Sequence, residues 1–275
     1  MSQTTSLRMT LPLSEMIYWS VAGAMAVAFA VTLLIATFDQ RTIDGAISVW
    51  AKPLKFEFSL AIHAGTLALV MAGLSQGTRT GSAMTIVAIA FLAACVIEMS
   101  YIIGQAARAE HSHFNMSTPF YRFMWSMMAI AAVVIIGAAA AVGIATAFDS
   151  DSSFPPALRW AIILGLLGGT LLTLYTAFTI GARMSPYIGS APTHEMRMVL
   201  TGWSLAGGDL RVSHFLATHM IQILPLAGLA IALVAPGRAG IAVVLVIAAL
   251  WTAATLAEYT RALGGKPSPT ALLLS

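Results

Sequence analysis

Charged residues are scarce in this chain of 275 residues: only 9% are Asp, Glu, Lys or Arg, whereas 59% are hydrophobic. A soluble domain has about 25% charged residues, so a soluble globular protein is excluded. Seven apolar stretches are long enough to cross a bilayer core of about 30 Å. The sequence therefore predicts an all-α polytopic integral membrane protein, a single domain with transmembrane helices near 17–36, 54–74, 83–104, 123–147, 158–181, 212–234 and 240–262.

Several functional motifs are also absent. Cys95 is the only cysteine, which excludes disulfide frameworks and cysteine-based zinc or iron–sulfur sites. There is no phosphate-binding P-loop, because the glycines from Gly165 to Gly169 lie in the middle of a span, where they favour close helix packing. The last span has no lysine to hold a retinal. The Lys and Arg residues form no basic stripe, which argues against nucleic acid as a partner.

The distribution of basic residues predicts the orientation in the membrane. Ten Lys and Arg residues fall on the side of the C-terminus, and four on the side of the N-terminus. By the positive-inside rule, the C-terminus is cytoplasmic and the N-terminus is outside. We expect a bacterial inner (plasma) membrane location, with the first apolar run retained as a span because it is too long for a signal peptide. The expected partners are membrane lipids and a small lipid-soluble substrate or electron carrier.

Three spans carry ionisable side chains that point to one site. His63 lies in the second span, Glu98 in the third and His219 in the sixth. Ionisable groups inside a bilayer are costly and usually face the bundle interior. Each of the three lies about 12 Å from the predicted helix end on the side of the C-terminus, so we expect them to converge. Two imidazoles and one carboxylate suit zinc or non-haem iron and leave a coordination position open.

Further polar residues near the same face complete the predicted site. The candidate metal ligands are His63, Glu98, His111, His113, His214 and His219. The candidate catalytic groups, including proton shuttles, are Glu98, His113 and His214. The candidate cofactor-binding residues are Gln105 and Gln222, which would hydrogen-bond the ligands, and Arg108 and Arg211, which would bind an anionic headgroup or carboxylate.

These residues lead to three functional hypotheses. The first is a membrane metalloprotein, an oxidoreductase or other metal-dependent enzyme that uses non-haem iron, zinc or copper on a lipid-soluble substrate. The second is a b-type haem electron-transfer protein with His63 and His219 as axial ligands. The third is a proton-coupled transporter in which the same histidines and Glu98 carry protons.

Some of these residues also have simpler interpretations. A lone histidine in a span often makes only a helix–helix hydrogen bond. Glu98 could form an ion pair with Arg108 instead of binding a metal. Glu57 lies about 120° from His63 around the helix axis, which predicts a position at the membrane interface. His194 lies in a polar loop and is predicted to be outside the site. Asp209 is a predicted N-cap of the sixth span.

Overall fold

Seven long helices form the protein in the computed structural model, which describes residues 11–43, 47–189, 191–198 and 201–269. They are α1 (Leu13–Phe38), α2 (Ala51–Gly73), α4 (Ser82–Ala107), α5 (Pro119–Phe148), α6 (Pro156–Arg183), α7 (Leu210–Val234) and α8 (Arg238–Leu263). Each is long and apolar enough to cross a membrane. The predicted all-α, seven-helix integral membrane fold is therefore confirmed, and every predicted span corresponds to one helix.

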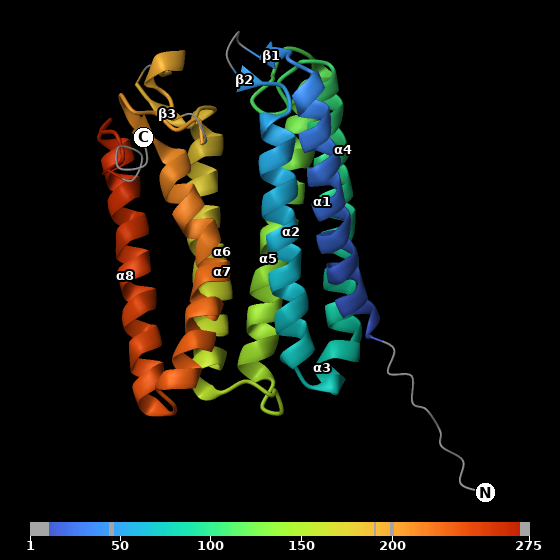
Figure 1. The fold of residues 1–275 in the computed structure, drawn as a ribbon, viewed down its shortest axis with the longest axis vertical. Helices are drawn as coiled ribbons and strands as arrows, with labels where there is room; N and C mark the ends of the chain where they lie inside the picture. Colours follow the sequence, from blue (N-terminus) through green and yellow to red (C-terminus); the bar gives the residue numbers. More distant parts are fainter. Residues whose placement is uncertain (1–10, 44–46, 190, 199–200, 270–275) are drawn as a thin grey trace, which may run out of the picture.

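The short elements mostly lie at one end of the bundle (Figure 1). There β1 (Thr42–Ile43) pairs antiparallel with β2 (Ile47–Ser48), and β3 (Tyr187–Ile188) pairs antiparallel with β4 (Gly208–Asp209). A 3-10 turn, η1 (His194–Met196), lies between β3 and β4 in the chain. We call this end, where α8 ends, the C-side. The opposite end, the N-side, holds the start of α1 and the short helix α3 (Gln76–Thr80).

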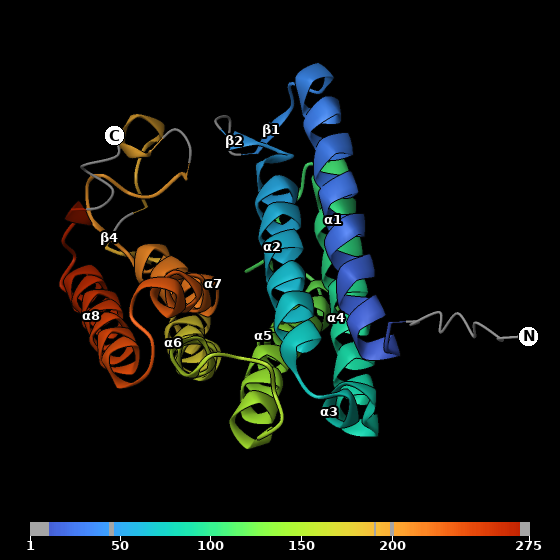
Figure 2. The ribbon, with the colours of Figure 1, turned by 60° about the horizontal axis from the view of Figure 1, so that its bottom comes forward.

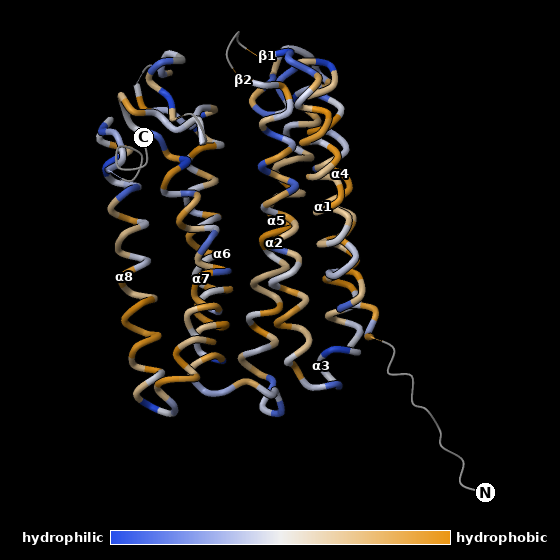
Figure 3. The backbone as a smooth tube through the Cα atoms, in the orientation of Figure 1, coloured by the Kyte–Doolittle hydropathy of each residue, from blue (hydrophilic) through white to orange (hydrophobic). Residues whose placement is uncertain are grey.

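The long helices pack in two groups. In the first group α1 packs against α2 and α4, and α4 packs against α5. In the second group α7 packs against both α6 and α8. Figure 2 shows α5 between the two groups, and the groups meet where α5 contacts α6 and where α2 contacts α7. Hydrophobic residues dominate the middle of the helices, whereas hydrophilic residues gather at the two ends (Figure 3).

Close packing within the second group depends on glycine. A Cβ atom added to Gly165 on α6 would lie 2.8 Å from Cδ of Pro225 on α7. A Cβ atom added to Gly169, also on α6, would lie 2.7 Å from Cγ1 of Ile221 on α7. Real Cβ atoms do not approach carbon this closely, so glycine allows the two backbones to touch. The predicted role of these glycines in helix packing is confirmed.

Helix ends on the C-side differ from the predicted spans. Helix α2 begins at Ala51, because Pro53 fits the first turn, where a backbone N–H has no helical partner to lose. Helix α4 continues to Ala107, three residues beyond the predicted span. At about 1.5 Å per residue, His63 lies about 18 Å from the start of α2, and Glu98 about 14 Å from the end of α4. The two residues are therefore not at the equal depth that was predicted.

Candidate functional site

The carboxylate of Glu98 on α4 is buried in the C-side half of the bundle. The residue is 2% exposed, and its Oε2 atom has no hydrogen-bond partner among the described residues. Its Oε1 atom lies 3.8 Å from Nε2 of His113, in the connection between α4 and α5. Lys52, in the first turn of α2, is close enough for its charge to act on Glu98. One buried carboxylate therefore has a histidine from another segment close to it and lies within range of the charge of a lysine from α2.

His113 is enclosed by aromatic rings. The centre of its ring lies 5.6 Å from that of Trp125 and 6.0 Å from that of Phe56. Burial, followed by the positive charge of Lys52, lowers the pKa of His113 to about 3. Its imidazole is therefore neutral near pH 7, with one nitrogen as a donor and the other as an acceptor. Nδ1 lies 3.3 Å from the Ser112 hydroxyl oxygen. The ring can relay a proton between Glu98 and Ser112 once a small movement closes the 3.8 Å between Nε2 and Glu98 to hydrogen-bond distance.

Hydrogen bonds hold the connection that carries His113. Gln105 donates to the backbone oxygen of His111 at 3.2 Å and to Oε2 of Glu110 at 3.3 Å. Arg108 donates to Oε1 of Glu110 at 3.0 Å, and Tyr121 donates to the same carboxylate. The hydrogen bond from Tyr121 is the main reason that the pKa of Glu110 is lowered. Gln105 and Arg108 thus hold the connection in place. Arg108 forms its ion pair with Glu110 and not with Glu98.

The same connection is held in an unusual backbone conformation. Phe114 has a φ angle of 61° and Ala109 one of 56°, in the left-handed region that side chains other than glycine rarely adopt. Strained residues persist only where the surrounding contacts impose them, and they cluster at functional sites. Here the ring of Phe114 packs on Trp125, with ring centres 4.8 Å apart. The strain is consistent with a connection shaped to place the His113 ring.

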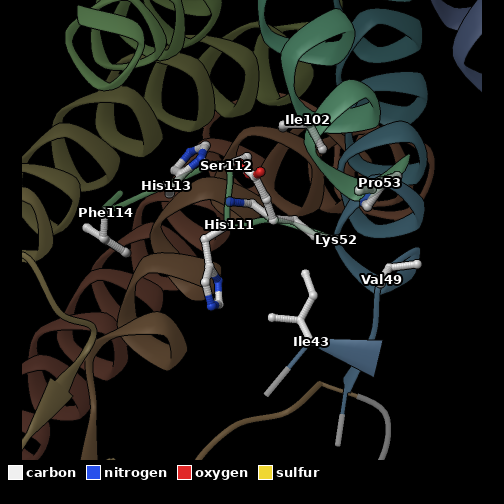
Figure 4. A pocket seen from close by; sticks show the side chains of 11 residues that line it. Ile43, Val49, Lys52, Pro53, Ile102, His111, Ser112, His113 and Phe114 are labelled. Carbon is white, nitrogen blue, oxygen red and sulfur yellow. Dashed lines mark hydrogen bonds between the residues drawn. The ribbon is translucent and has the colours of Figure 1, made fainter. Parts of the chain in front are cut away.

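A cavity of about 130 Å³ lies beside this cluster (Figure 4). Its polar lining residues are Lys52, Glu110, His111, Ser112 and His113. The Lys52 side chain extends from α2 toward the segment that carries Ser112 and His113, while the ring of His111 points away from His113. The rest of the wall is apolar and comes from β1, the residues just before α2, α2 itself, α4 and Phe114.

A second set of histidines lies between the two helix groups. His63 on α2 is 5% exposed and stacks on Phe91 of α4, with ring centres 5.9 Å apart. Its Nε2 atom has no hydrogen-bond partner among the described residues. On α7, Nδ1 of His219 lies 3.3 Å from Oε1 of Gln222, the contact expected for Gln222. His219 is close enough for its charge to act on both His63 and His214.

His214 contacts the second group of helices. Its Nδ1 atom lies 2.9 Å from the hydroxyl oxygen of Thr176 on α6. Thr173, one turn earlier on α6, has its hydroxyl 3.3 Å from that of Thr218 on α7. His214 thus faces α6, whereas Glu98 and His113 lie in the first group. The structure therefore separates the predicted catalytic residues into two places.

The predicted three-ligand metal centre is not formed. Across the part of the chain that the structure describes, no group of three or more His, Cys, Asp or Glu side chains is arranged to hold a metal ion. Glu98 contacts His113 near the C-side, whereas His63 lies deeper and stacks on Phe91. The difference in depth given by the helix ends explains the separation. Neither the Lys52 cavity nor the apolar cavity between α1 and α4 is lined by His63 or His219.

Arg211 does not point to an external anion. Its guanidinium donates to Oδ2 of Asp209 at 2.5 Å, to the hydroxyl of Tyr187 at 3.0 Å and to the backbone oxygen of Gly202 at 2.7 Å. Asp209 also accepts from the backbone N–H of Arg211 at 3.0 Å, which confirms Asp209 as the N-cap of α7. Arg211 therefore ties the segment between α6 and α7 to the start of α7.

Two charged groups lie where the sequence does not predict them: Glu57 is buried and Lys52 is half-buried. Glu57 was predicted at the membrane interface, but it is 0% exposed and accepts a hydrogen bond of 2.7 Å from Thr32 on α1. Lys52 is one of the ten basic residues that predict the orientation, and in the structure it also lines the cavity beside the Glu98 cluster. A signal for Lys52 was its place next to Pro53, because a proline in the first turn extends the helix to include it.

Comparisons with known proteins add no family assignment. The sequence matches no protein-family model, and neither curated proteins nor solved structures show a significant similarity to it.

Proposed function

We propose that the protein is a proton-coupled membrane carrier in which Glu98 binds the coupling proton. The observation that carries this proposal is the buried Glu98 carboxylate, which lies beside Lys52 and a neutral His113 in a bundle of membrane-spanning length. A buried carboxylate is costly unless it is paired or protonated. An ionisable residue inside the membrane usually belongs to an ion or proton pathway. A carboxyl group that alternates between these surroundings and water takes up and releases a proton.

The helix arrangement supports a carrier rather than a static pore. Many carriers alternate between two open states when one group of helices moves against another. Here α1, α2, α4 and α5 form one group and α6, α7 and α8 form the other. His63 and His219 come from different groups, so polar side chains lie along the contact that such a movement would change. A further polar contact lies near the C-side, where the ammonium of Lys55 on α2 donates to the backbone oxygen of Thr201 at 2.8 Å.

The direction that we propose for proton movement follows from the orientation that the Lys and Arg distribution predicts. With the C-side in the cytoplasm, Glu98 and His113 lie nearer the cytoplasmic surface than the outer one. His113 then connects Glu98 to Ser112 and to the cavity at that surface. This path delivers the proton to the cytoplasm when the carrier faces inward.

The test is proton flux into proteoliposomes that contain the full chain, followed by a pH-sensitive dye in the lumen, because a carrier that moves one anion with one proton transfers no net charge. Acetate, L-lactate, glycine, choline, Na⁺ or K⁺ is added outside, and protein-free liposomes give the background flux. At least one solute should give a proton flux above this background, and Glu98→Gln should lose that flux because glutamine binds no proton. Glu57→Gln is the matched control, a buried glutamate of α2 outside the cluster, and it should keep the flux. No proton flux above background with any solute, or the same flux in Glu98→Gln, would overturn the proposal.

Two of the hypotheses stay predictions: a metalloprotein with oxidoreductase or other enzymatic activity, and a b-type haem protein. Elemental analysis and an absorption spectrum of protein purified without chelator check both. The carrier proposal predicts neither a stoichiometric transition metal nor a Soret band. A metal or haem that His63→Ala and His219→Ala each remove would favour the two earlier hypotheses instead.

A further inference from the structure

The cavity beside Glu98 has the composition of a small-anion site. Its one lysine, Lys52, is flanked by walls that are largely apolar, including Ile43, Val49, Ile102 and Phe114. No described residue accepts a hydrogen bond from the Lys52 ammonium, whose Nζ atom lies 5.7 Å from the centre of the Phe56 ring. A cation inside largely apolar walls attracts an anion more strongly than it would in water.

The other charged groups around the cavity do not replace this cation. His113 is held neutral by burial and by Lys52 itself, which keep its pKa at about 3. The Glu110 carboxylate already accepts hydrogen bonds from Arg108 and Tyr121, and His111 is exposed. Glu98, from α4, is therefore the acidic group whose charge acts most directly on Lys52.

We propose that this cavity binds a small monocarboxylate, whose carboxylate group pairs with the Lys52 ammonium and whose short carbon chain contacts the apolar wall. The proposal rests on the proposed carrier function and names the substrate class of that carrier.

The size and charge of the site favour a monocarboxylate over other anions. An apolar protein cavity of about 150 Å³ holds benzene, which has six carbon atoms. A cavity of about 130 Å³ thus suits four to six heavy atoms, the size of acetate or lactate. A dianion such as phosphate would have Lys52 alone to balance two charges, because Arg108 is already paired with Glu110, and it would also face the carboxylate of Glu98. Like charges at close range in a low dielectric are strongly unfavourable.

Charge balance then links anion binding to the Glu98 proton. Without the anion, the ionised carboxylate of Glu98 offsets the charge of Lys52. When a carboxylate anion binds, one ammonium faces two carboxylates, so Glu98 takes a proton from water and becomes neutral. The net reaction is the uptake of one anion and one proton together, and no covalent bond changes except at the Glu98 carboxyl. By linkage, the proton promotes anion binding as much as the anion promotes protonation.

The test is calorimetry of the full-length protein in detergent, with acetate and L-lactate as probes. Titrations in two buffers of different ionisation enthalpy measure the protons taken up. We expect about one proton per anion, and a dissociation constant that rises about tenfold per pH unit once Glu98 is ionised. Glu98→Gln should bind acetate with no proton uptake and no such pH dependence.

Substitutions at two lysines of α2 test the binding residue. Lys52→Met should lose acetate binding, Lys52→Arg should retain it because the charge remains, and Lys55→Met is the matched control that should bind as wild type does. Acetate binding that survives Lys52→Met, or inorganic phosphate that binds more tightly than acetate, would overturn the proposal. If Lys52→Met fails to fold, the proton count of Glu98→Gln still decides, because uptake in that variant contradicts the linkage.

The failures of the two proposals are distinguishable. If Na⁺ or choline gives a proton flux above background in proteoliposomes but no carboxylate binds, the carrier remains and the monocarboxylate assignment fails. If acetate binds with proton uptake in detergent but gives no proton flux above that of protein-free liposomes, the binding site remains and the carrier fails.

Discussion

Replacing His113 by glutamine should make the protein less sensitive to acid. Burial and the charge of Lys52 lower the pKa of His113 from 6.5 to about 3, and the side chain is 22% exposed. The folded protein therefore binds this proton less readily than the unfolded chain does. The stability that follows is fully present above pH 6.5, and it is lost progressively as the pH falls from about 6.5 towards about 3.

The magnitude follows from the size of the shift. Each pH unit below the unfolded pKa costs about 1.4 kcal/mol for one proton. At pH 5 the folded imidazole is still neutral, so the free energy of unfolding should be about 2 kcal/mol lower than at pH 8 through His113 alone. For a chain of this size, about 2 kcal/mol corresponds to a fall of about 4–8 °C in the thermal midpoint.

The assay compares the thermal midpoints of wild type and His113→Gln in detergent at several pH values, followed by tryptophan fluorescence. Glutamine does not titrate, so the variant should lose about 4–8 °C less than wild type between pH 8 and pH 5. Contributions from the other titrating groups are common to both proteins and cancel in the difference. If the two midpoints fall in parallel, His113 is not held neutral by its surroundings and the reasoning is refuted.

Two further predictions concern orientation and packing. In a Cys95→Ala background, cysteines placed at the exposed positions Ser117 and Ser150 should label from opposite sides of intact cells, with Ser150 reached from outside; labelling of both from outside would contradict the topology. Gly165→Ala puts a Cβ atom 2.8 Å from a proline ring atom of α7 and should lower stability by about 1–3 kcal/mol. The control Gly137→Ala, where no atom lies within 4 Å, should be neutral or stabilising by up to about 1 kcal/mol, and equal effects at the two glycines would refute the close contact.

Hydropathy alone determined the membrane fold of this protein. In a bilayer core every backbone polar group must be satisfied within its own segment, so an apolar run of sufficient length has one regular solution, a helix. That constraint is local, and the seven predicted spans accordingly match seven helices. The same argument holds for Asp209, whose role as N-cap depends only on its own side chain and the next turn of backbone.

Which residues form the site could not be predicted from local sequence, because it depends on where separate helices begin and end. Histidines and Glu98 on three spans marked the C-side half correctly as the region rich in buried ionisable groups, but equal spacing from predicted helix ends did not bring them together. Helix ends shifted by three residues change depth by nearly one helical turn. Such shifts moved Lys52 into α2 and placed His63 deeper than Glu98.

The rotation of each helix was decided only by tertiary packing. Glu57 and His63 lie on different faces of α2, so the sequence suggested that one of them faces outward. Both are buried, because α1 covers one face of α2 through Thr32, while α4 packs against the face that carries His63. Hydrophobicity cannot reveal this when lipid and protein neighbours are equally apolar. Which polar groups share a site is therefore determined by the neighbours that each helix meets in the folded bundle.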